Sequence, residues 1–141
     1  LDHLVGATLR IAPRVEEHGD ALTLDAGTRR NLELDVSLTG NEDATLLAVL
    51  DTTATAMGAR ALRRWLGRPI TQRSTLRERY HAIGALGDSR RFEALQSGLR
   101  AVGDIERVLA RVALRSARPR DLVQLRNALA QLPALRSLLR S

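Results

Sequence analysis

The segment TTATAMGARALRRWLGRPI (residues 52–70) contains the clearest helical pattern in the chain. At 100° per residue its apolar side chains gather on one half of a helix, and Arg60, Arg63 and Arg64 lie on the other half. The threonines and Gly58 mark the start of this helix, and Pro69 marks its end because proline disfavours helical geometry in the residue before it. We therefore expect a short amphipathic helix near residues 57–68 that packs by its apolar half.

Helical periodicity continues from Asp25 to the end of the chain, with apolar residues recurring every three or four positions. Asp25 or Thr28, then Ser89 and Asp104, stand where three of the helices are expected to begin. Residues 105–118 form one expected helix, and Pro133 is expected to divide a helix at 119–132 from a last one at 133–141. Residues 7–24 instead alternate around a Gly19 turn, which favours a hairpin or paired extended segments.

The predicted fold is therefore mostly α: a multi-helix bundle in residues 25–141, preceded by a short extended or β-hairpin segment in residues 1–24. Met57, Trp65, Tyr80 and Phe92 occupy apolar helical positions, so we expect all four in the core. The leucine-rich residues 120–139 have two open interpretations. They fold back onto the core, or they form an exposed patch through which the chain self-associates as a homodimer.

Composition excludes several classes of protein. The chain has 141 residues, of which 44% are hydrophobic and 27% charged, as in an ordinary globular domain. It has no run of about 18 apolar residues and no secretory pattern, so we expect a cytoplasmic protein with no membrane partner. There are no cysteines, and the three histidines lack ligand spacing, so no metal site is predicted.

The net charge of +6 arises entirely from arginine, since all 22 basic residues are arginines. A lysine-dependent phosphate-binding loop is therefore excluded, and we predict no catalytic residue and no cofactor site. A second arginine stripe lies in residues 105–118, where no acid stands four residues before any of its arginines. The two stripes are candidates for an interdomain or anionic-partner surface, with solvation or intramolecular pairing as the alternative: Arg60, Arg63, Arg64, Arg107, Arg111, Arg115 and Arg118.

Three segments resemble the core and lever domain of the bacterial MutS family of DNA mismatch-repair proteins: LDAGTRRNLEL, TLLAVLDTTATAMGARALRRWLGRPI and VGDIERVLARVALRSARPRDL. They occur in the family's order, and the resemblance covers residues 22–133. Ala56 stands where the family often has proline, and Gly27 where alanine is usual. Both departures concern local turn or helix stability.

The resemblance implies a structural segment between the connector and the DNA clamp, without the clamp and ATPase domains. Its expected partners are the other domains of the parent protein and, through them, mismatched duplex DNA. ATP and Mg²⁺ would belong to the full-length protein. Phe92 is followed directly by Glu93, so the family's Phe-x-Glu mismatch reader does not occur there. Two alternatives stay open, an autonomous basic helical DNA-binding module and a helical module that binds proteins.

Overall fold

The computed structural model describes residues 21–88 and 91–140. Over these residues the secondary structure is helical, which confirms the predicted mostly α fold, and the only β-type pairing recorded there is a bridge between Ala21 and Ile70. The proposed hairpin lies almost wholly in residues 1–20, outside the described residues. The elements are α1 (Ala26–Asn31), η2 (Glu42–Ala44), α2 (Leu46–Leu50), α3 (Ala56–Gly67), α4 (Arg73–Asp88), α5 (Arg91–Arg100), α6 (Ile105–Ala113) and α7 (Pro119–Arg140).

Short polar side chains determine where several helices begin. The Asp25 carboxylate accepts a hydrogen bond from the Thr28 N–H, and the Asp104 carboxylate accepts one from the Arg107 N–H. Thr55 caps α3 in the same way, because its hydroxyl accepts from the Gly58 N–H at 2.9 Å. Such caps satisfy backbone donors that have no partner within the helix. The predicted starts at Asp25 and Asp104 are confirmed.

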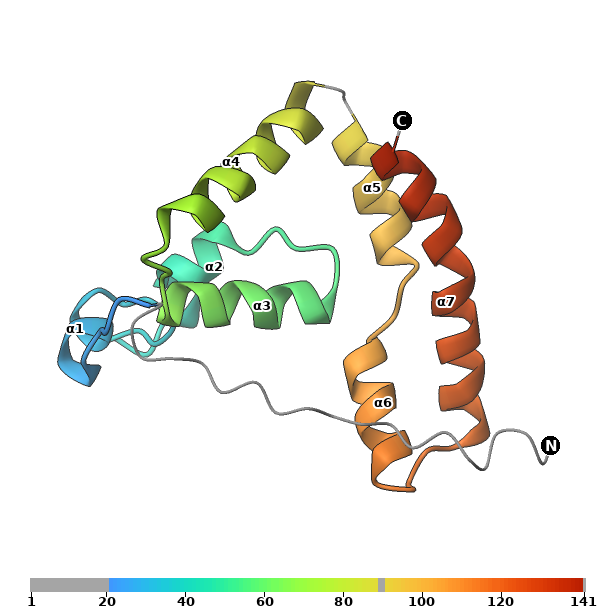
Figure 1. The fold of residues 1–141 in the computed structure, drawn as a ribbon. Helices are drawn as coiled ribbons and strands as arrows, with labels where there is room; N and C mark the ends of the chain where they lie inside the picture. Colours follow the sequence, from blue (N-terminus) through green and yellow to red (C-terminus); the bar gives the residue numbers. More distant parts are fainter. Residues whose placement is uncertain (1–20, 89–90, 141) are drawn as a thin grey trace.

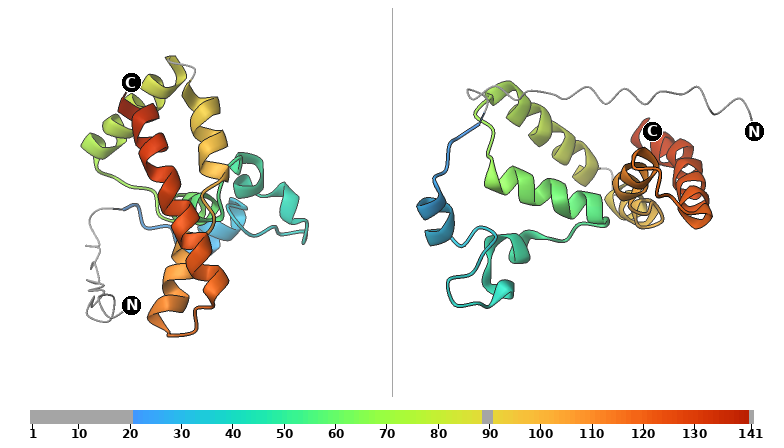
Figure 2. Two further views of the ribbon diagram at one scale, coloured as in Figure 1. Left: turned by 90° about the vertical axis from the view of Figure 1, so that its right-hand side faces the viewer. Right: turned by 90° about the horizontal axis from the view of Figure 1, so that it is seen from below.

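The helices form two groups that meet near the start of α3. Figure 1 shows α5 and α6 one after the other along the long α7, which runs back in the opposite direction. The second group holds α1, η2, α2, α3 and α4. The right-hand view of Figure 2, seen from below, shows this group extending away from the first. Helix α4 leads from the second group to α5, with which it makes its main helix contacts.

The larger buried cluster lies where these groups meet. Val102, Ala128 and Leu135 are buried together, and apolar residues of α3, α5 and α6 pack against them: Met57, Leu95, Leu99 and Ile105. Met57 therefore contributes to the core through the start of α3. Leu34 and Leu47 are buried in the other group, where the Leu47 N–H donates to the Leu34 carbonyl.

Three predicted core residues are exposed, and those predictions are wrong. Trp65, Tyr80 and Phe92 have exposed fractions of 52%, 69% and 54%. Helical spacing groups them with other apolar residues, but the described elements leave about half or more of each residue exposed, and the contact over the Trp65 ring comes from the Arg79 guanidinium of α4. Amphipathic spacing reports a shared face and cannot report whether a second element packs on that face.

Two helix boundaries also differ from the prediction. Pro133 lies inside α7 instead of dividing two helices. Ala128 before it and Leu135 after it enter the same buried cluster, so packing on both sides outweighs the roughly 3 kcal/mol cost of a proline in a helix interior. Helix α6 ends at Ala113, and Arg115 adopts a left-handed backbone conformation with φ of 54°. This turn directs the chain back into α7.

Candidate functional site

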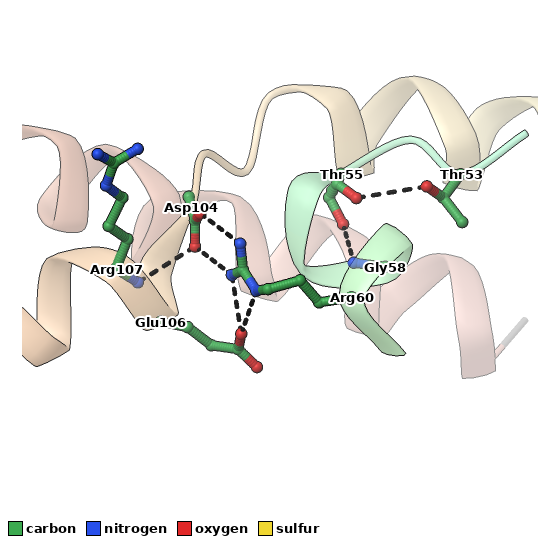
Figure 3. Close-up of polar contacts among 7 residues, drawn as sticks. All are labelled: Thr53, Thr55, Gly58, Arg60, Asp104, Glu106 and Arg107. Carbon is green, nitrogen blue, oxygen red and sulfur yellow. Dashed lines mark hydrogen bonds and ion pairs between the residues drawn. The ribbon is translucent and has the colours of Figure 1, made fainter. Parts of the chain in front are cut away.

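Arg60 of α3 joins the two groups of helices through a pair of carboxylates (Figure 3). Its two terminal nitrogens donate to the Asp104 oxygens at 2.7 and 2.8 Å. Its Nε and Nη2 donate to Glu106 Oε2 at 3.1 and 2.8 Å. We call Arg60, Asp104 and Glu106 together the α3–α6 joint. Because a planar guanidinium satisfies both acids at once, the arrangement fixes the orientation of α3 against the start of α6.

The electrostatics of this joint favour the charged forms of its members. Hydrogen bonds to Asp104 and then to Glu106 hold the pKa of the Arg60 guanidinium above its usual value. The hydrogen bonds from Arg60 in turn lower the pKa of Asp104, against an opposing effect of partial burial. The Arg60 side chain is 42% exposed, so solvent screens these attractions and the joint contributes more to orientation than to stability.

For Arg60, this pairing favours the intramolecular alternative to the predicted interdomain or anionic-partner surface. Sequence reasoning missed its partners because they lie 44 and 46 positions away. One local signal was present: Glu106 has no arginine four residues after it on its own helix. An arginine that pairs with it was therefore to be sought on another element.

The second predicted arginine stripe does not form a single face. Arg111 is paired with Asp121, and the Asp121 carboxylate also accepts from the Arg118 N–H at 2.9 Å. Arg115 lies in the turn after α6, and Arg118 immediately precedes α7. The stripe is divided because α6 ends at Ala113, five residues before the predicted end at Arg118.

Asp121 is the most buried charged residue described, with an exposed fraction of 2%. The Arg118 N–H lowers its pKa most, burial opposes this shift, and the Arg111 charge lowers the pKa further. A buried carboxylate requires such partners, because desolvation strongly disfavours an unpaired charge. Asp121 thereby ties the end of α6 to the first turn of α7.

The remaining arginines of α3 lie at a hollow of about 1020 Å³ beside α1 and the start of α4. Arg63 and Arg64 line it, and both are exposed. Trp65 also lines it, with the Arg79 guanidinium 3.8 Å from the centre of the indole ring. We call this feature the arginine-lined hollow. Of the predicted surface, Arg60, Arg63 and Arg64 line this hollow, and Arg107, Arg111, Arg115 and Arg118 do not.

The described residues include no group of histidine, aspartate and glutamate side chains placed to hold a metal ion. Likewise, in residues 21–88 and 91–140 no helix combines the length and apolar character needed to cross a bilayer.

The observed class is an all-helical domain in which two groups of helices are joined by a small core and an ionic contact. Residues 27–141 match the family model described as MutS domain III. The chain therefore belongs to the MutS domain III family, a non-catalytic core domain of the MutS mismatch-repair ATPases. This match confirms the resemblance inferred from the three sequence segments.

Proposed function

We propose that this chain is the core and lever segment of a cytoplasmic MutS-like mismatch-repair ATPase and that it couples the DNA clamp to the ATPase domain. The match of residues 27–141 to MutS domain III carries this proposal. Coupling requires stiff elements and a joint that has few alternative arrangements.

The helices of this chain suit such a role. With 22 residues and a rise of about 1.5 Å per residue, α7 is a rod of about 33 Å. Its first turn is held by Asp121, and its middle packs in the cluster with Val102. A displacement of α3 would reach this rod through Met57 and the α3–α6 joint. In this proposal Arg60 transmits orientation between the two groups.

The chain on its own is expected neither to hydrolyse ATP nor to prefer mismatched DNA. A lysine-dependent phosphate-binding loop for ATP does not fit this chain, because its 141 residues include no lysine. Other domains of the parent protein would bind ATP, Mg²⁺ and the mismatched duplex. A gel-shift titration with matched and mismatched duplexes should give equal, weak and salt-sensitive binding. A clear preference for the mismatch would contradict this assignment and favour an autonomous DNA-binding module.

The coupling role is tested in the full-length parent protein with Arg60→Gln. We expect basal ATP hydrolysis and DNA affinity to be retained, while the change in hydrolysis caused by mismatched DNA is reduced several-fold. Arg126→Gln is the matched control, because Arg126 lies on α7 and its guanidinium donates to the side chain of its neighbour Asn127. An unchanged response in Arg60→Gln would contradict coupling through this joint.

We also propose that the outer face of α7 contacts another protein surface, either a second copy of this chain or another domain of the parent. Four of its leucines are between 45% and 59% exposed: Leu122, Leu129, Leu132 and Leu139. Contiguous apolar patches on a protein surface commonly mark interaction sites. Leu135 is 7% exposed, so only part of the leucine-rich segment folds onto the core.

A further inference from the structure

The arginine-lined hollow concentrates positive charge on one side of the molecule. Six arginines and one acid, Asp35, are the charged residues that line it in the described part of the chain; the arginines are Arg29, Arg60, Arg63, Arg64, Arg68 and Arg79. Arg60 is paired with Asp104 and Glu106, and an Arg29 nitrogen lies 3.8 Å from an Asp35 oxygen. Among the described residues, neither Arg63 nor Arg64 has an acidic partner within ion-pair distance. These two arginines therefore carry positive charge that no described acid neutralises.

The spacing of these arginines suits a chain more than a single ion. Arg60 and Arg64 stand four positions apart on one side of α3, about 6 Å along its axis, and Arg68 directly follows the end of the helix at Gly67. An extended peptide covers that length with about two residues, and its alternate side chains point to the same side. Arg63 and Arg64 are both exposed, so they do not enclose a buried binding site for a single inorganic anion.

The half-exposed Trp65 further distinguishes a protein ligand from a nucleic acid. Tryptophan and arginine are the residues most enriched at energetically dominant positions of protein interfaces. Base stacking would need open aromatic faces, but one face of Trp65 is occupied by Arg79, and neither Tyr80 nor Phe92 lines the hollow. Guanidinium groups pair well with carboxylates, which supplies the charge complementarity.

We propose that the arginine-lined hollow is a docking site for an extended acidic segment of another protein, with carboxylates meeting Arg63 and Arg64 and an apolar side chain covering Trp65. This inference goes beyond the coupling role and does not depend on it.

Trp65 makes the proposal directly testable, because it is the only tryptophan of the chain. The probe is an acetylated and amidated heptapeptide in which four glutamates alternate with three leucines, and its counterpart has glutamine at every glutamate position. Titration of the 141-residue chain should give a saturable change in tryptophan fluorescence with the glutamate peptide only. Binding should weaken as salt is added, because the contacts are exposed ion pairs.

The double variant Arg63→Gln with Arg64→Gln should weaken peptide binding about tenfold, as expected for the loss of two exposed charge pairs. The control double variant Arg126→Gln with Arg136→Gln removes the same charge from α7 and should bind within about twofold of the original chain. Circular dichroism and thermal unfolding of both double variants verify that each is folded.

Several results would overturn the proposal: no fluorescence change at millimolar peptide, equal binding of the glutamine peptide, or equal weakening by the control variant. Tighter binding of a single-stranded oligonucleotide or of pyrophosphate, with the same dependence on Arg63 and Arg64, would replace it by phosphate recognition. Because these titrations use the isolated chain, their failure leaves the coupling experiment unaffected.

Discussion

Single carboxylates at helix boundaries hold much of this structure together. Asp25 and Asp104 cap helices. The Asp121 carboxylate, in the first turn of α7, accepts hydrogen bonds from the Arg111 side chain and from the Arg118 N–H. Asp104 is also the residue to which Arg60 reaches from α3. Asp104 therefore caps α6 and also orients α3. The acidic residues, fewer than the arginines, determine the geometry of the joints.

These carboxylates predict how stability depends on pH. Hydrogen bonds and nearby arginines lower the pKa of Asp104 and Asp121 from the usual value of 3.8. The unfolded chain then binds protons at a higher pH than the folded chain, so their stabilising effect is present above about pH 4 and is lost as pH falls below it. The contribution of these two carboxylates to the melting temperature should change little between pH 7 and pH 5. It should fall steeply in more acidic solution.

Asp121→Asn tests the assignment to one residue. It should lower the melting temperature at neutral pH and make the fall in acid shallower, because a neutral amide no longer titrates. Asp43→Asn removes an exposed carboxylate that pairs with no side chain among the described residues, and should leave the acid profile unchanged. Identical acid profiles for Asp121→Asn and the original chain would show that Asp121 does not contribute.

At the scale of one element, leucines of α7 that are neighbours on one side of the helix differ in energetic importance, because burial ends before the last turn. Leu135 is 7% exposed and belongs to the cluster with Val102 and Ala128, whereas Leu139, one turn later, is 59% exposed. Leu135→Ala should lower the free energy of unfolding by about 2 to 5 kcal/mol through lost burial and the cavity left behind. Leu139→Ala should change it by about 0.5 kcal/mol or less. Urea denaturation of both variants measures the difference, and equal effects would contradict the described packing of α7.

At the scale of the whole molecule, the exposed leucines of α7 predict concentration-dependent self-association. Sedimentation velocity should show a larger species as concentration rises, most simply a twofold pair. Leu132→Glu should shift this equilibrium toward the monomer by placing a charge in the apolar face. Leu135 is unsuitable for this purpose because its substitution would disturb the core.

Val49→Glu is the matched control for self-association, because Val49 is 71% exposed on α2, away from α7. It should leave the equilibrium unchanged. A chain that stays monomeric at every concentration would leave contact with another domain of the parent protein as the role of this face.

Local chemistry in the sequence determined the helical class of the fold, several helix starts and the family. Caps such as Asp25 and Asp104 act within three residues, and proline at position 69 acts on its neighbours, so both can be interpreted without knowledge of the tertiary fold. The family segments are likewise a property of residue order. None of these inferences requires knowing which helices touch.

Only the tertiary structure decided which surfaces are covered and which charges are paired. Trp65 lines an open hollow, and Arg60 meets acids more than 40 positions away. Pro133 stays helical because Ala128 before it and Leu135 after it are buried in one cluster. Each outcome depends on contacts between elements far apart in the chain. Periodicity specifies a helix face, but the free energy of that face depends on the element that does or does not pack against it.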